Sequence, residues 1–197
     1  MIKIPKNEIS RKVIHILSSL IPLSYSWFIK DKSIMISILV VLSLFALVVE
    51  YLRNNWTFFS KLFIALFFYM LRDREVKGEI TGATWLLIGW TITVIMFNMP
   101  IAVAALLFLS IGDSFAALGG KLFPRVQIGN KTLSGTLCGL VISLIVVLLI
   151  NQSLLPAVIF SGAVAAMGIE LIPLRTNDNL TIPIFSGSVM LVADFLI

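Results

Sequence analysis

The chain is poor in the charged residues that soluble proteins carry on their surfaces. Charged residues make up only 13% of its 197 residues, whereas hydrophobic residues make up 59%, and the mean hydropathy is +1.05. This composition excludes an ordinary soluble protein and is typical of an integral membrane protein. Nucleic acid is also excluded as a partner, because the basic residues are scattered between apolar runs and interleaved with acids. We expect residues 1–197 to form a single membrane-embedded domain.

Cysteine and histidine each occur once. The single cysteine, Cys138, excludes an internal disulfide and lies in an apolar run, where we expect it to pack. The single histidine, His15, excludes a histidine-based zinc cluster. A Walker A loop is absent as well, because no Gly-x-x-x-x-Gly-Lys-Ser/Thr motif occurs in the sequence.

Long apolar runs dominate the sequence instead. A helix needs about 20 residues to cross a hydrocarbon core of roughly 30 Å. We predict an all-α integral membrane protein with about seven transmembrane helices plus one short interfacial helix. The first run follows basic residues as a signal peptide does, but no small-residue cleavage pattern follows, so we expect it to be retained. The predicted spans are 13–29, 33–51, 82–97, 100–118, 135–151, 155–172 and 181–197.

The apolar run at 57–71 is shorter than the others. Its helix would be roughly 22 Å long, which is too short to cross a bilayer without tilting or thinning it. Lys61, Tyr69 and Arg72 fall near one stripe of this helix, and phenylalanine and leucine occupy most of the rest. We therefore predict a half-buried helix at the membrane interface.

The basic residues predict the orientation of the chain. With seven crossings, every Lys and Arg except Lys30 and Lys32 lies on one side of the membrane. Because Lys and Arg accumulate in cytoplasmic loops, we place this side and the N-terminus in the cytoplasm. A crossing at 57–71 would flip all later loops and divide the basic residues more evenly. All acidic residues except Asp31 and Asp194 gather on the same side, where a mixed layer would suit a polyanion with a divalent metal, although simply polar loops give the same pattern.

Four motifs lie in this polar layer. The first is at the N-terminal end of the first predicted helix. Glu8, Arg11, Lys12 and His15 are spaced by three, one and three residues, which places them close together on the helix. This face is suited to binding a phosphate. The alternative is an interfacial anchor that holds one satisfied histidine.

The second motif, at 72–84, is a charged loop that runs into a helix start rich in glycine and threonine. Small residues at a helix N-terminus leave backbone donors free and form a natural anion site. Lys77 is the candidate phosphate ligand of this loop. A solvated loop followed by an N-cap explains the same residues.

The third motif centres on Asp113, an acid inside an apolar run that opens into Gly119, Gly120 and Lys121. An ionised carboxylate in a membrane segment is costly and usually marks a metal, ion or substrate site. A second glycine-rich stretch with a lysine follows at 129–135. Glycine amides and lysine bind phosphate, and a carboxylate holds magnesium. The alternative is that the small residues pack helices together and Asp113 is merely hydrogen-bonded.

The fourth motif begins with Glu170, near the cytoplasmic end of its predicted helix, and continues with Asp178 and Asn179. Asp178 and Asn179 are candidate metal ligands. Polar residues ahead of Pro183 also form an ordinary cap for the last helix.

These four motifs, in this order, resemble the polyprenol kinase family, which comprises dolichol kinases, phytol kinases and CTP-dependent diacylglycerol kinases. The likeness covers nearly the whole chain. One position departs from the family pattern Lys-Ser/Thr-x-Glu-Gly, because Ser134 stands where the Glu would be, so no role of that acid is carried over. The resemblance is carried by Glu8, Arg11, Lys12, His15, Glu75, Lys77, Gly82, Gly112, Asp113, Ala116, Gly119, Lys131, Thr132, Gly135, Glu170, Asp178, Asn179 and Pro183.

The resemblance implies a Mg²⁺-dependent transfer of the γ-phosphoryl group of a nucleoside triphosphate, typically CTP, to the hydroxyl of a membrane lipid. The expected acceptors are dolichol or another polyprenol, a phytol-type prenol, and diacylglycerol. ATP as the donor and a homodimer both stay open, and so does whether Asp113 binds the metal, takes the hydroxyl proton or does both. The expected catalytic residues are Asp113, Lys131 and Asp178, and the expected metal ligands are Asp113, Glu170 and Asp178. Nucleotide binding is expected of Arg11, His15, Lys77, Gly112, Gly119, Gly120, Lys121, Thr132, Gly135 and Asn179.

Two other functions are weighed against a kinase. A phosphatidate cytidylyltransferase also joins CTP chemistry to a lipid, but its usual His-Gly-Gly and Asp-Arg-x-Asp motifs do not occur here. A small transporter or flippase would use Asp113 as an ion-coupling residue. Transporters usually spread polar residues through the membrane depth, whereas here they gather on the predicted cytoplasmic side.

Overall fold

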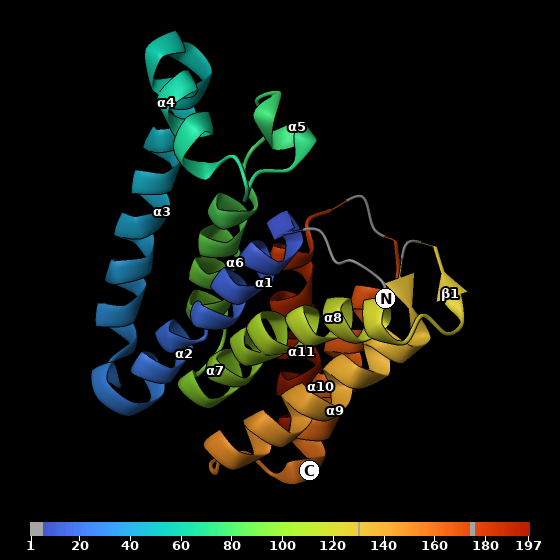
Figure 1. Ribbon diagram of the computed structural model, residues 1–197. Helices are drawn as coiled ribbons and strands as arrows, with labels where there is room; N and C mark the ends of the chain where they lie inside the picture. The colour runs from blue at the N-terminus through green and yellow to red at the C-terminus, as the bar shows by residue number, and fades with distance from the viewer. Residues whose placement is uncertain (1–5, 130, 174–175) are drawn as a thin grey trace.

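The protein folds into a bundle of helices with one small hairpin, as a computed structural model shows (Figure 1). The structure describes residues 6–129, 131–173 and 176–197, with side chains from Ser10 onward. The description therefore leaves out the side chains of Lys6 and Glu8, and it leaves out Lys3 and Arg175 entirely. The elements are α1 (Lys6–Leu17), α2 (Leu20–Ser24), the π-helix η1 (Tyr25–Ile29), α3 (Lys32–Asn55), α4 (Thr57–Phe67), α5 (Asp73–Val76), α6 (Gly82–Met96), α7 (Met99–Leu107), the π-helix η2 (Phe108–Asp113), α8 (Ser114–Leu122), β1 (Gln127–Ile128), β2 (Lys131–Thr132), α9 (Leu133–Ile150), α10 (Pro156–Leu171) and α11 (Asp178–Leu196).

Each predicted span coincides with a helical segment, and the prediction of an all-α integral membrane protein is confirmed. Two of these segments, α6 and α10, have only 15 and 16 residues, so the number of seven crossings stays a prediction. Within the part of the chain that the structure describes, five segments are long and apolar enough to cross a membrane: Ser10–Ile29, Lys32–Asn55, Met99–Leu122, Leu133–Ile150 and Asp178–Leu196.

Short polar side chains set the starts of the helices. The Asp31 carboxylate accepts a hydrogen bond from the backbone N–H of Ile34, and Asn98 does the same for Ile101. Thr81 and Thr132 cap α6 and α9 in the same way. Each cap satisfies a backbone donor that the first helical turn leaves free, so the apolar runs break into separate helices at these positions.

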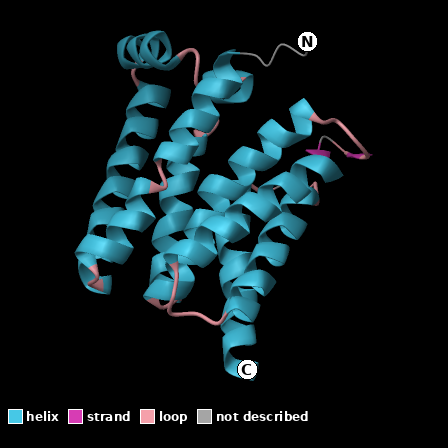
Figure 2. Cartoon of the chain, turned by 60° about the horizontal axis from the view of Figure 1, so that its bottom comes forward, coloured by secondary structure: helices cyan, strands magenta, loops and turns pink. Residues whose placement is uncertain are grey.

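The helices run up and down so that the predicted cytoplasmic loops gather at one end of the bundle. Figure 2 shows the hairpin near this end and the C-terminus at the opposite end. We call the end that holds the hairpin the polar end. It comprises residues 55–81, 123–129, 131–132 and 176–178. The charge pattern predicted this grouping, while the compartment that the polar end faces stays a prediction.

The short run at 57–71 forms α4, an 11-residue helix. Figure 2 shows it lying across the end of α3. None of its residues is buried in the protein. Phe58, Leu62 and Leu66 are exposed, as expected for a helix that places apolar side chains in lipid, and its position at the membrane interface stays a prediction.

The central helix of the bundle is Met99–Leu122, which consists of α7, η2 and α8. It is 78% buried inside the protein over its most apolar window, against 28% or less for the other four long segments. Helices α9, α10 and α11 all pack against it. Its π-helical stretch ends at Asp113, and such stretches occur frequently at functional sites.

Glycines allow α8 and α9 to approach closely. A Cβ atom at Gly135 would lie 2.4 Å from the carbonyl oxygen of Ala116, and one at Gly119 would lie 2.6 Å from the Cβ of Cys138. Small residues at such contacts let two membrane helices pack backbone against backbone. The packing alternative of the third motif therefore accounts for these glycines and for Cys138.

Gly89 provides a matched test of helix packing. A Cβ at Gly89 would lie 2.3 Å from the carbonyl oxygen of Asn179, whereas a Cβ at Gly168 in α10 meets nothing within 4 Å. We expect Gly89→Ala to lower the free energy of unfolding by about 1–3 kcal/mol, because α6 and α11 must move apart. Gly168→Ala should leave stability unchanged or raise it by up to about 1 kcal/mol. Thermal unfolding in detergent measures both, and equal stability of the two variants would contradict the packing.

Candidate functional site

Asp113 is held by two residues of the first helix. The Lys12 Nζ lies 2.6 Å from the Asp113 Oδ2 and 3.2 Å from its backbone oxygen, and the His15 Nδ1 lies 3.3 Å from the same Oδ2. All three side chains are at most 15% exposed. A buried carboxylate needs such partners because an unpaired charge is costly away from water. The first and third motifs thus meet in one cluster, which we call the Asp113 cluster.

Lys131 forms a second cluster with the two acids of the fourth motif. Its Nζ lies 3.1 Å from the Glu170 Oε1 and 3.0 Å from the Asp178 Oδ2, and it also donates to the Glu170 carbonyl. Burial lowers the pKa of Lys131, but the two carboxylates outweigh it and raise the pKa above its ordinary value. Lys131 is therefore a permanent cation between α10 and α11, and we call this group the Lys131 cluster.

The two clusters are neighbours, and the Lys131 cluster lies at the polar end. A Cβ at Gly112 would lie 2.6 Å from the Met167 Cε, so the residue before Asp113 packs against α10 one turn below Glu170. The charges of Asp113 and Asp178 both act on Glu170.

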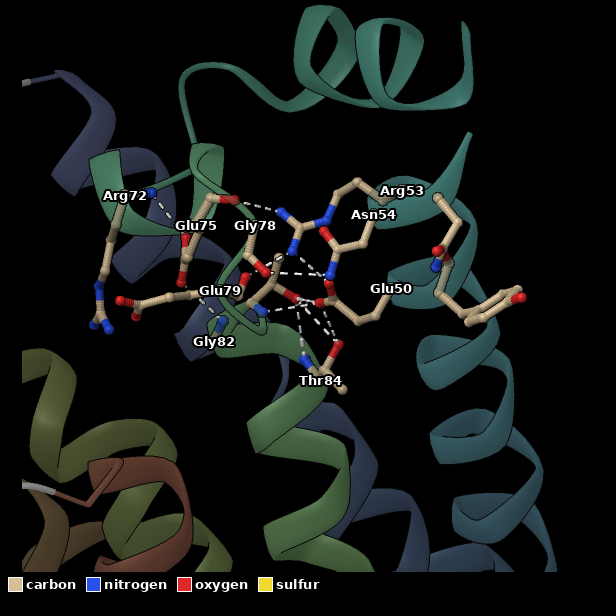
Figure 3. Close-up of polar contacts among 12 residues, drawn as sticks. Glu50, Arg53, Asn54, Arg72, Glu75, Gly78, Glu79, Gly82 and Thr84 are labelled. Atoms are coloured by element: carbon tan, nitrogen blue, oxygen red, sulfur yellow. Dashed lines mark hydrogen bonds and ion pairs between the residues drawn. The ribbon is translucent and has the colours of Figure 1, made fainter. Parts of the chain in front are cut away.

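A third polar group ties the loop of the second motif to α3 (Figure 3). Glu50 and Arg53 are buried, with 6% and 3% exposure, and their side chains pair at 2.5 Å. The other Glu50 oxygen accepts from the Thr81 backbone N–H at 2.8 Å and from the Thr81 and Thr84 hydroxyls. Arg53 donates to the Glu75 carbonyl at 2.6 Å. These contacts fix both ends of the loop.

Glu75 connects this loop to the last helix. Its carboxylate accepts from the backbone N–H of Arg72 at 2.7 Å and from that of Gly82 at 2.9 Å. The Asn179 side-chain amide donates to the Gly82 carbonyl at 2.7 Å. Three residues of the resemblance, Glu75, Gly82 and Asn179, are therefore joined in one chain of hydrogen bonds next to Asp178.

The glycines expected to bind phosphate lie inside helices. Gly119 and Gly120 are in α8, and a Cβ at Gly120 would lie 2.5 Å from the Thr132 Oγ1. Backbone amides inside an α-helix already donate to carbonyls four residues earlier. The Gly119 and Gly120 amides are therefore not available to surround a phosphate. Gly112 and Gly135 also sit at helix contacts. Thr132 itself caps α9 by accepting from the Gly135 N–H.

The other residues expected to bind nucleotide lie on or beside helices α1, α5, α8 and α11. Arg11 is half-buried on α1, Lys77 is exposed after α5, and Lys121 lies in the last turn of α8. The N-cap of α11 is Asn177, whose side chain accepts from the Asn179 N–H. Asp178 is thus the first residue of the helix and is free to pair with Lys131.

Ser134 has a structural part where the family commonly has an acid. Its hydroxyl donates to the Phe123 carbonyl and accepts from the backbone N–H of Arg125 at 3.2 Å. It holds the end of α8 against the start of α9.

The predicted set of three carboxylate metal ligands is not gathered in one place. Within the described ranges, no three His, Cys, Asp or Glu side chains form a group that would hold a metal ion. Asp113 is bound by α1, whereas Glu170 and Asp178 share Lys131. Glu170 and Asp178 already surround one cation, the Lys131 ammonium. Two carboxylates fit Mg²⁺, because this ion usually keeps water and substrate phosphates as its other ligands.

Sequence reasoning missed Glu50, Arg53 and Arg72. Glu50 falls at the end of the predicted span 33–51, and Arg53 follows three residues later. The rule that drew attention to Asp113, an acid in an apolar helix, applies equally to Glu50. A spacing of three residues predicts their ion pair.

No protein-family model matches the chain, and no solved structure matches it. An uncharacterized protein of Rickettsia prowazekii is 26% identical over 185 aligned positions, which cover 90% of each chain. The CTP-dependent diacylglycerol kinases 1 of Saccharomyces cerevisiae and Eremothecium gossypii are each 26% identical and match 95% of this chain. These matches cover 73% and 67% of the two kinases. The motifs, the membrane helices and these matches agree, and the chain is distantly similar to the CTP-dependent diacylglycerol kinases of the polyprenol kinase family.

Proposed function

We propose that the protein is a lipid kinase that transfers the γ-phosphoryl group of CTP to the hydroxyl of a membrane lipid alcohol. The observation that carries this proposal is the pair of neighbouring lysine–carboxylate clusters in an apolar bundle, one of which lies at the polar end. A lipid hydroxyl lies at the membrane interface, at the same level as such an end, and a nucleotide approaches it from water. The two CTP-dependent relatives support CTP as the donor.

The Asp113 cluster is assigned to the acceptor alcohol. Lys12 and His15 hold the Asp113 carboxylate in one orientation, with one oxygen bound by both. Asp113 accepts the hydroxyl proton as the oxygen of the alcohol bonds to the γ-phosphorus and the bond to the β-phosphate oxygen breaks. Most of the catalysis in phosphoryl transfer comes from positioning and charge neutralisation. Fixing the carboxylate is therefore the main contribution of Lys12 and His15.

The Lys131 cluster is assigned to the phosphates. Glu170 and Asp178 would hold Mg²⁺, which neutralises charge on phosphate oxygens when it is bound. Lys131 sits between the two acids and turns its ammonium to the nucleotide, where a lysine acts as a compact point charge on phosphate.

Labelled CTP tests the proposed activity. Purified protein is incubated with γ-labelled or α-labelled CTP, Mg²⁺ and a panel of dolichol, a shorter polyprenol, phytol and diacylglycerol. We expect label in a lipid product from γ-labelled CTP only, and a parallel ATP arm defines the donor. Transfer of the α-label to a lipid would instead indicate a cytidylyltransferase. Label in no lipid of the panel would contradict the proposal.

A further inference from the structure

Arg72 is a half-buried cation at the polar end. Its backbone N–H is anchored on Glu75 at 2.7 Å. Figure 3 shows its side chain extending away from Glu50, with the guanidinium clear of the hydrogen bonds drawn there. Among the described side chains, no acid forms an ion pair with it. The loop therefore holds an arginine in place and leaves its donors unused by acids.

The hydrogen bonds of the loop place Arg72 next to the last helix, because Arg72 and Gly82 both donate to Glu75 and Asn179 donates to Gly82. Burial lowers the pKa of Arg72, and the neighbouring Arg11 guanidinium lowers it further, while Glu75 and Asp113 act in the opposite direction. Arg11 and Asp113 belong to α1 and η2, and their charges reach Arg72 from the Asp113 cluster and its helix. The Arg11 charge acts against the Arg72 charge, and a bound polyanion removes that repulsion.

We propose that Arg72 and Arg11 form a phosphate-binding pair that takes the phosphate chain of the nucleoside triphosphate beside Asp113. This proposal rests on the proposed function. A guanidinium presents five donors in a rigid fork that matches phosphate oxygens, and it stays charged when half-buried. The shared chemistry is that of a phosphate group, which a nucleotide or an anionic lipid headgroup supplies.

The hydrogen-bonded loop positions Arg72 before the substrate arrives. Glu75 binds the N–H of Arg72 and that of Gly82. Arg53 holds the Glu75 carbonyl from α3. Holding a binding group in its productive position removes the ordering cost from the binding step. The buried Glu50, Arg53 and Glu75 side chains thus hold the loop that presents Arg72 to the substrate (Figure 3).

Replacement of Arg72 tests the pair against a matched control on the same short helix. The control is Arg74→Gln, because Arg74 is 57% exposed and loses the same charge. We expect Arg72→Gln to raise the KM for CTP at least tenfold with the lipid KM unchanged, and Arg72→Lys to recover part of the loss. Arg74→Gln should change both values less than twofold. Titration with a non-hydrolysable CTP analogue in detergent measures the same loss as a binding constant.

The outcomes separate this proposal from the proposed function. An active wild-type protein whose Arg72→Gln variant binds the analogue within twofold of wild type overturns the arginine pair and leaves the kinase intact. A rise in the lipid KM or a loss of product inhibition by lipid phosphate, without a change in the CTP KM, assigns Arg72 to a headgroup and also overturns the pair. A wild-type protein that binds CTP but phosphorylates no lipid overturns the proposed function alone. If Arg72→Gln does not fold, Arg72→Lys is compared with wild type instead, and a CTP KM equal to that of wild type overturns the pair.

Discussion

An Asp113→Asn variant is expected to lose at least about a hundredfold in kcat, within the 10²–10⁴-fold range of a lost acid–base group. The amide has nearly the shape of the carboxylate but neither accepts the hydroxyl proton nor carries the charge that pairs with Lys12. Initial rates with γ-labelled CTP and the preferred lipid alcohol measure the loss. Detergent extraction and thermal unfolding show whether the variant still folds.

Asp194→Asn is the control for Asp113. Asp194 is exposed near the C-terminal end of α11, away from the polar end, and the substitution removes the same charge. Its rate should stay within twofold of wild type. A folded Asp113→Asn protein with wild-type kcat would remove Asp113 from the reaction, whatever the lipid.

Arg53→Met should lower the free energy of unfolding by about 3–5 kcal/mol, because it leaves Glu50 as a buried acid without its counter-ion. Glu50 is 6% exposed and keeps only the donors of Thr81 and Thr84. The loop also loses the two carbonyl contacts of Arg53, at Glu75 and Glu79. Chemical denaturation in detergent, followed by helix content, measures the change.

The double variant Glu50→Gln with Arg53→Met separates the buried charge from the lost packing. It should be more stable than Arg53→Met alone, because no unpaired charge remains. Lys61→Met is the surface control, since Lys61 is exposed on the neighbouring α4, and it should change stability by less than about 0.5 kcal/mol. If the double variant is no more stable than Arg53→Met alone, the ion pair is not what holds the loop.

The helices of this protein were predictable because hydropathy and capping act locally. Runs of apolar residues and the caps Asp31 and Asn98 lie within a few positions of the helix ends that they define. Asp113 was identifiable for the same reason, since its cost depends on the apolar run around it. These features need no knowledge of which helices are neighbours.

The partners of the charged residues were not predictable, because they depend on which helices are neighbours. The sequence placed Asp113, Glu170 and Asp178 in one metal site, whereas the fold brings Lys12 to Asp113 and Lys131 to the other two acids. The glycines of α8 show the same limit. Their type fits both a phosphate loop and a helix contact, and only the position of α9 distinguishes the two.

The long sequence separation of the site contacts has a consequence for how the protein is made. Lys12 and Asp113 are 101 residues apart, and Gly82 and Asn179 are 97 residues apart. During synthesis Lys12 therefore has no Asp113 to pair with until the central helix has been made. The Lys131 cluster is completed only when the last helix, which carries Asp178, is inserted. A ribosome-bound chain that stops before Asp178 therefore lacks a finished site. For the proposed kinase, we therefore expect catalysis only after the last helix has entered the membrane.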